Sequence, residues 1–142
     1  MKFRFRLEKA LHFARLNETV QKMEVAKTLQ RIETVKARKL VVEEQLRSVL
    51  NEASQAPAGA RAPFQATRIA ADTDEISRLG LVLRKEEIAA ERARAELGRL
   101  AMRRKALESL EEKRRTEFNF ARNRQQQMEV EESFRLIPKK PD

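Results

Sequence analysis

The sequence contains no cysteine, tryptophan or tyrosine, and it has only three glycines and four prolines. The lack of cysteine excludes a disulfide framework and a thiolate zinc site. No apolar run is long enough to cross a bilayer, and the charged N-terminus does not resemble a secretory signal, so the expected location is the cytoplasm. Aromatic residues make up 5% of the chain, which leaves little material for a wide hydrophobic core.

Charged residues make up 37% of the chain and give it a net charge of +9. Alanine, leucine, glutamate, lysine, arginine and glutamine dominate, and these residues lose least on entering a helix. Basic and acidic residues are interspersed along most of the sequence, as on a solvated helical surface. The basic excess lies at residues 2–9 and 103–124. We interpret it as a solvated face or a surface for an acidic protein; binding to nucleic acid or lipid is the second interpretation.

The strongest pattern lies between residues 76 and 128. Apolar residues recur there at steps of three and four when Ile76 is placed at heptad position a, and no proline interrupts them. Charged residues fill most flanking positions, which is typical of a helix on the order of 80 Å long packed along one partner helix. Arg104, Glu111 and Arg114 interrupt the apolar line. Buried polar groups in this line, which we call the seam between the two helices, can fix the register of the helix pair. Alternatively, the seam opens at these residues and water reaches them.

A second helical pattern covers residues 7–50, without proline or glycine. It drifts between Leu16 and Val25, which predicts an irregular supercoil. Leu40 and Val41 widen the strip near its end, which indicates either extra packing near the turn or a partner surface. The apolar residues that we assign to this helix are Leu7, Leu11, Ala14, Leu16, Val20, Met23, Val25, Leu29, Ile32, Val35, Val42, Leu46 and Val49.

Residues 51–66 mix two prolines and a glycine with small polar residues, which predicts a loop. Pro63 fits the first turn of the next helix, where its missing N–H costs nothing. A connection of this length lets a second helix, residues 67–133, fold back on the first before a tail at residues 134–142. The predicted fold is therefore all-α: a long antiparallel two-helix coiled-coil hairpin that forms a single domain over residues 1–142.

Folding back at this loop places Leu50 near Ile69 and Leu7 near Glu112. Residues 113–133 then extend beyond the start of the first helix as an overhang of about twenty residues. A lone helix of that length is marginal in water, so we expect the overhang to be stabilised by a partner.

The first six residues alternate Phe3 and Phe5 with lysine and arginine. Such alternation is compatible with a short strand, but no partner strand is predicted elsewhere. We therefore expect the entry to a helix that begins near Leu7. The two phenylalanines either pack on the C-terminal half of the long helix or bind a partner.

Motifs for catalysis are absent. The sequence has no phosphate-binding glycine loop and no metalloprotease or nucleophile-elbow motif. His12 is the only histidine and is expected to be an ordinary surface residue. Glutamate pairs that are adjacent in sequence diverge on a helix and form no carboxylate dyad. We expect a non-enzymatic protein without cofactor or metal.

Four motifs, taken in order, resemble the flagellar export proteins of the FliJ family. Residues 3–11 read F-R-F-R-L-E-K-A-L, similar to the family's opening F-x-F-x-L-E-x-[VA]-L, and residues 43–46 read E-E-Q-L. Residues 103–107 read R-R-K-A-L, and residues 126–129 read Q-Q-M-E. The similarity covers the whole length and the helix–loop–helix layout.

This resemblance implies a component of the flagellar type III protein export apparatus, needed for flagellum biogenesis and motility. The family fold resembles the γ-subunit stalk of rotary ATPases. The implied partners are the hexameric export ATPase FliI, the cytoplasmic domain of the export gate protein FlhA, and export chaperones, which the protein would help to escort. The implied location is the cytoplasm, peripheral at the cytoplasmic face of the inner membrane at the flagellar basal body.

The family's functional residues carry over by position to two ends of the hairpin. The implied ATPase-binding end comprises Phe3, Phe5, Leu7, Leu11, Leu107, Leu110, Arg114, Phe118, Ala121 and Arg122. The implied gate-binding end comprises Gln45, Val49, Ile76, Leu79 and Leu83. Glu52 and Ala56 stand where some family members have aromatic residues, which weakens the implied gate contact.

Two alternatives stay open from the sequence. One is the equivalent stalk protein of a virulence type III secretion system, which has the same architecture. The other is a basic coiled coil that binds nucleic acid, for which a steep loss of affinity with salt would be the signature.

Overall fold

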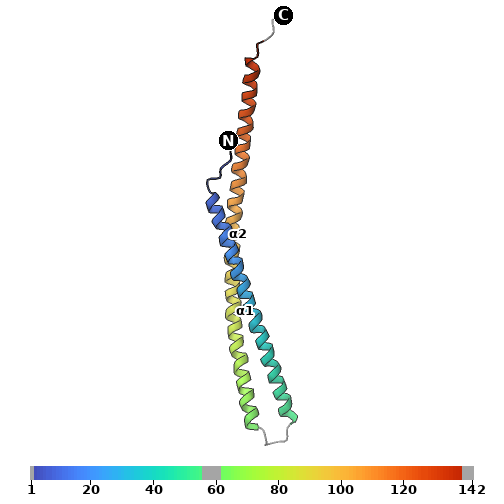
Figure 1. Ribbon diagram of the computed structural model, residues 1–142. Coiled ribbons are helices and arrows are strands. Elements are labelled where there is room, and N and C mark those ends of the chain that lie inside the picture. Colours follow the sequence, from blue (N-terminus) through green and yellow to red (C-terminus); the bar gives the residue numbers. More distant parts are fainter. Residues whose placement is uncertain (1, 56–61, 139–142) are drawn as a thin grey trace. The chain divides into compact units, whose positions relative to one another are not determined.

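The computed structural model describes residues 2–55 and 62–138. It contains two helices, α1 at Glu8–Gln55 and α2 at Ala62–Leu136, and no strand within those residues (Figure 1). The prediction of an all-α fold with two long packed helices is confirmed. Both helices extend further toward their connection than the sequence predicted, and Pro63 lies in the first turn of α2 as expected. Neither helix has a segment apolar enough to cross a membrane within the described residues.

Contacts along the chain group it into two compact units. Unit 1 comprises Met1–Glu18 and Arg99–Asp142, and unit 2 comprises Thr19–Gly98. The sequence predicted one domain. In a pair of helices each residue contacts only the residues that lie beside it on the other helix. Contacts are therefore local along the pair, and they can group into more than one unit.

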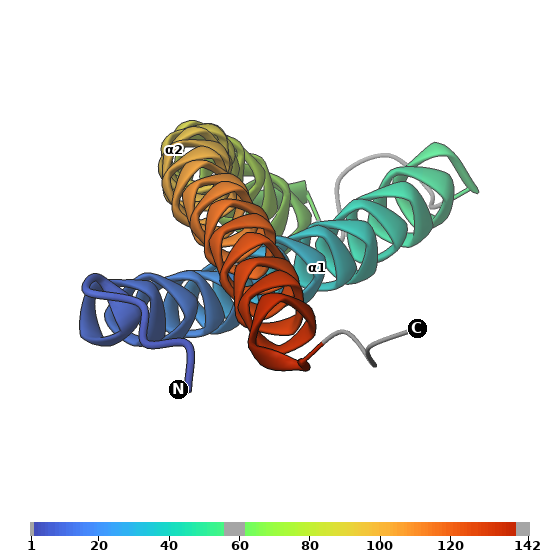
Figure 2. The same ribbon diagram turned by 90° about the horizontal axis from the view of Figure 1, so that it is seen from above.

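Unit 2 pairs the later part of α1 with the first part of α2. Arg38 forms an ion pair with Glu75 at 3.0 Å, and the Gln21 amide donates a hydrogen bond to the Ala93 carbonyl at 3.0 Å. The position on α2 rises as the position on α1 falls, so the two segments run antiparallel, as predicted. Figure 2 shows the two helices from above, with α1 coloured from blue to green and α2 from green to red.

The core of unit 2 is a narrow line of aliphatic residues. Val42 has 0% of its surface exposed, whereas its neighbours Leu40 and Val41 are 62% and 48% exposed. The apolar strip at these three residues is therefore wider than the core of the unit, and Leu40 and Val41 do not pack in it. The other buried aliphatic residues of this unit are Ile32, Val49, Leu79 and Ala90.

The drift of the apolar pattern in the first helix is not a drift of its covered positions. The buried and half-buried positions of α1 keep regular steps of three and four, because polar residues occupy the seam where the apolar pattern failed. These polar positions are Glu18, Gln21 and Thr28, and the Thr28 hydroxyl donates to the Glu24 carbonyl at 2.9 Å. The residues that the sequence placed in the seam but that are exposed are Leu16, Val20 and Met23 within α1, and Leu7 just before it.

Unit 1 pairs the first turns of α1 with the part of α2 that follows residue 98. Leu11, Ala14 and Leu100 are buried there. Every described residue from 119 to 138 is exposed, so the predicted overhang is present. It starts after Phe118 and not at residue 113, because the segment before α1 also packs on α2.

Candidate functional site: the N-terminal arm and the base of unit 1

An extended segment, residues 2–7, precedes α1; we call it the arm. Residues 2–5 have no regular structure and a turn follows at Arg6 and Leu7. The Glu8 amide donates to the Phe5 carbonyl at 3.2 Å, which closes the turn into the helix. Phe3 and Phe5 are half-buried, while the basic residues between them are exposed. The alternation of the sequence thus produces an apolar side that packs and a charged side that faces water.

The arm is held by an aromatic contact with α2. The ring centroids of Phe3 and Phe118 lie 5.6 Å apart with a tilt of 55° between the ring planes. The guanidinium carbon of Arg115 lies 5.3 Å from the centroid of Phe3, which is within range for a cation–π interaction. Of the two expectations for the phenylalanines, packing on the C-terminal half of the long helix is the one observed for Phe3.

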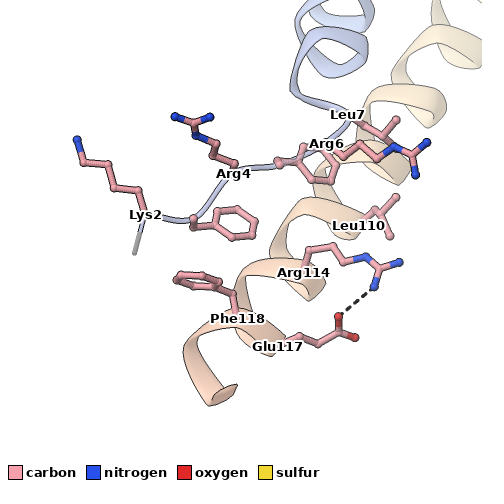
Figure 3. A pocket seen from close by; sticks show the side chains of 10 residues that line it. Lys2, Arg4, Arg6, Leu7, Leu110, Arg114, Glu117 and Phe118 are labelled. Carbon is pink, nitrogen blue, oxygen red and sulfur yellow. Dashed lines mark hydrogen bonds and ion pairs between the residues drawn. The ribbon is translucent and has the colours of Figure 1, made fainter. Parts of the chain in front are cut away.

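A pocket of about 750 Å³ opens between the arm and α2; we call it the arm pocket (Figure 3). Its aromatic and aliphatic residues come from both segments, and basic residues surround them. Figure 3 shows Lys2 and Arg4 pointing away from the α2 ribbon. The lining residues are Lys2, Phe3, Arg4, Phe5, Arg6, Leu7, Leu110, Arg114, Glu117 and Phe118.

The electrostatics of the arm pocket are strongly positive. Four of its charged lining residues are basic, and Glu117 is the single acid among them. The carboxylate of Glu117 is paired within the pocket, because the Arg114 guanidinium donates a hydrogen bond to it at 3.2 Å. An apolar floor with a basic rim fits a protein segment that presents apolar side chains flanked by carboxylates.

A second, smaller hollow of about 380 Å³ continues along α2 beyond Phe118, which lines both. It lies on the overhang, where α1 no longer covers α2. The other residues that line it are Ala121, Arg122, Gln125, Gln126 and Glu129. Phe118 therefore belongs to two adjoining surfaces, the arm pocket and this hollow, which together we call the base of unit 1.

A polar cluster lies in the seam of unit 1. The Arg104 guanidinium donates to the buried carboxylate of Glu18 and, at 2.8 Å, to Glu108, which also pairs with Arg15 at 3.3 Å. The hydrogen bond to Glu18 is the main reason that the pKa of Arg104 is raised above its ordinary value; desolvation opposes it, and the negative charges of Glu108 and Glu18 add to it. Arg104 therefore stays charged and spans the two helices, in agreement with the register-fixing interpretation.

The other two polar positions that interrupt the predicted seam behave differently. Glu111 is half-buried and pairs with Arg115 at 3.1 Å, whereas Arg114 is exposed. The seam thus opens progressively toward the arm, as the second interpretation expected for this stretch.

The structure brings the predicted ATPase-binding residues together in unit 1. Six of them line the arm pocket: Phe3, Phe5, Leu7, Leu110, Arg114 and Phe118. Ala121 and Arg122 line the neighbouring hollow. Leu11 is buried and Leu107 is half-buried, so these two hold the helices together and offer little surface to a partner.

The predicted gate-binding residues lie in unit 2 and are mostly covered. Gln45 is exposed, but Val49 and Leu79 are buried, and Ile76 and Leu83 are half-buried. All four covered residues belong to the seam between α1 and α2. These residues can support the exposed residues of a partner-binding surface. Direct contact of Val49 or Leu79 with a partner would require α1 and α2 to separate.

Part of the site is not predicted by the sequence. Lys2, Arg4 and Arg6 stand out there only as basic excess, but in the structure they line the arm pocket. Arg115 carries no signal of its own in the sequence, although its guanidinium lies over the Phe3 ring. The alternation of phenylalanine with basic residues carried the signal, but an extended segment has no helical period from which its packing partner can be predicted.

No group of histidine, cysteine, aspartate or glutamate in the described part of the chain has the geometry to hold a metal ion. Comparison of the chain with family models, curated proteins and solved structures finds no match.

Proposed function

We propose that this chain is a stalk-like component of the flagellar type III export apparatus, which binds the export ATPase ring through the base of unit 1. The order of the four sequence motifs supports the family assignment. The arm pocket is the observation that carries the ATPase-binding role, because it gathers six of the ten implied contact residues around an apolar floor with a basic rim. Contact with the export gate through unit 2 and escort of export chaperones complete the proposed role.

The physical character of the base supports docking into an acidic protein site. Burial of Phe118 and Leu110 against a partner would supply apolar area, and the exposed cations of the arm would speed the encounter. Because those cations are solvent-exposed, the association rate should fall as salt shortens the Debye length from about 30 Å at 0.01 M to about 8 Å at 0.15 M.

The test replaces Phe118 with aspartate in the full chain and measures binding to the hexameric export ATPase of the same bacterium. We expect Phe118→Asp to weaken binding by at least tenfold, since it puts a carboxylate on the apolar floor of both hollows. Leu7→Asp, which changes the arm pocket alone, should weaken it as well. Co-sedimentation and stimulation of ATP hydrolysis give two independent readouts.

Phe64→Asp is the matched control, because Phe64 is an exposed phenylalanine of α2 that belongs to unit 2. Circular dichroism should show near-normal helicity for all three variants. Unchanged binding by both Phe118→Asp and Leu7→Asp would remove the docking claim. Binding to duplex DNA that is lost steeply with salt, without binding to the ATPase, would favour the nucleic-acid alternative.

A further inference from the structure

Unit 2 carries a shallow groove on the surface of α2 that the proposed function does not use; we call it the outer groove. It has a volume of about 520 Å³ and belongs to a single helix. Its lining residues are Leu81, Arg84, Lys85, Ile88, Ala89 and Arg92. From this groove we infer a docking site for an acidic amphipathic helix of a partner protein. The inference does not rest on the ATPase-binding role, which concerns unit 1.

The outer groove faces away from the helix pair. The covered positions of α2 in this stretch include Leu79, Leu83 and Ala90, which belong to the seam. Leu81 and Ile88 stand two residues before the last two of these, and a step of two residues is about 200° around a helix. They therefore lie on the opposite side of α2, where α1 cannot cover them.

The groove carries two exposed aliphatic side chains in one row. Leu81 is 69% exposed and Ile88 is 46% exposed. The two residues are seven apart, so they stand one above the other, and Lys85 and Arg92 continue the same row at steps of three and four. A row with this spacing is what one helix offers to another when their side chains interdigitate.

The charge around the groove is of one sign. Arg84, Lys85 and Arg92 are exposed and make no ion pair within the described residues, whereas Arg31 and Arg38 of the same unit pair with glutamates across the seam. The acidic residues of this stretch of α2, Glu86, Glu87 and Glu91, do not line the groove. The complementary partner therefore carries carboxylates on both sides of an apolar row.

The same charges argue against the other occupants. A second copy of this chain would bring identical cations together across a symmetric interface, which is repulsive. Phosphate groups of nucleic acid would pair with the cations but would leave Leu81 and Ile88 without apolar contacts. An acidic amphipathic helix satisfies both features at once.

The test uses the full chain and a fluorescein-labelled synthetic helix with leucines at i, i+4 and i+7 and glutamates beside them. Fluorescence anisotropy at low salt should show saturable binding, and a peptide of the same composition in scrambled order should bind at least tenfold more weakly. Ile88→Asp and the double variant Arg84→Glu/Arg92→Glu should each weaken binding by at least tenfold. Lys27→Glu/Lys36→Glu, which reverses two exposed cations of α1 in the same unit, is the charge-matched control and should retain binding.

Equal binding of the ordered and scrambled peptides, or unchanged binding by both groove variants, would overturn the inference. Self-association of the chain that is lost in Ile88→Asp would also overturn it. The same holds if the peptide does not bind but duplex DNA or anionic vesicles bind in a way that depends on Ile88. Phe118→Asp should leave peptide binding unchanged, and Ile88→Asp should leave ATPase binding unchanged. The two docking claims can therefore fail separately.

A photoreactive residue at Leu81 then identifies the natural occupant in cells. We expect the cross-linked segment, mapped by mass spectrometry, to be an acidic amphipathic helix whose capture is lost in the Arg84→Glu/Arg92→Glu background. A cross-linked segment that is basic or not helical contradicts the inference.

Discussion

Val42→Asp is expected to unfold unit 2, whereas Val41→Asp is expected to leave it folded. Val42 is fully buried in the seam, so the new carboxylate would lie in an apolar environment without a basic partner. The expected loss in the free energy of unfolding is at least about 4 kcal/mol, which is a large fraction of the roughly 5–15 kcal/mol typical of a native domain. Urea unfolding followed by circular dichroism, together with hydrogen exchange of amides in residues 19–98, measures this effect.

Val41 provides the matched control because it carries the same side chain one residue away and is 48% exposed. Its replacement by aspartate should change the free energy of unfolding by no more than about 0.5 kcal/mol. Similar losses for the two variants would mean that the seam does not pass through Val42 in the register described. The comparison therefore tests the helix pairing of unit 2 at single-residue resolution.

The second large effect is an asymmetry between the two sides of a buried ion pair in unit 1. Arg104→Leu is expected to lower the melting temperature by on the order of 10 °C, because the buried Glu18 carboxylate loses the charged donor that reaches it from the other helix. Glu18→Leu is expected to leave the melting temperature unchanged or to raise it. In that variant Arg104 keeps Glu108 as a partner, and a leucine joins the seam.

The double variant Glu18→Leu/Arg104→Leu completes the cycle. It should melt at least as high as the natural chain, since two apolar residues that pack well often match or exceed a buried ion pair in stability. Thermal scans by circular dichroism at one protein concentration measure all four proteins. Equal losses for the two single variants would contradict the burial of Glu18 as the cause.

The sequence predicted α2 better than α1, for a physical reason. Along α2 the covered positions carry apolar residues such as Leu79, Ala90 and Leu100, so hydrophobic periodicity alone located the seam. Along α1 two of the covered positions are Glu18 and Thr28, whose polar groups are satisfied by hydrogen bonds. Apolar periodicity cannot detect a seam position that a polar residue occupies, whether its hydrogen bond is made within the same helix, as for Thr28, or to the other helix, as for Glu18.

In the candidate site, too, some residues were predicted from the sequence and others were not. The family resemblance placed Leu110 and Phe118 at the same end of the hairpin, and Phe118 also follows the heptad of α2. The contact of Phe3 with Phe118 and the position of Arg115 over the Phe3 ring arise from an extended arm, and no periodicity links such a segment to its packing partner. The outer groove was not predicted either, because a lone pair of exposed aliphatic residues is common on helices and gains meaning only once the covered face is known.

The arm also explains how the base of unit 1 can expose apolar surface without a partner. The Phe3 ring packs against the Phe118 ring in a tilted contact, and the guanidinium of Arg115 lies over the Phe3 ring in turn. The apolar residues of the arm pocket are therefore partly covered by the arm, and the pocket beside them stays open. A partner that enters the pocket gains apolar contacts with an arm that is already packed on α2.

Photo-cross-linking at Phe118 shows whether this residue contacts the ATPase ring, and where. The full chain, with a photoreactive phenylalanine at position 118, is mixed with the hexameric export ATPase and irradiated, and the linked residues are mapped by mass spectrometry. We predict cross-links to residues that line the central channel of the ring, and none when the same group replaces Phe64. Cross-links confined to the outer surface of the ring, or none at saturating ATPase concentration, would contradict the account.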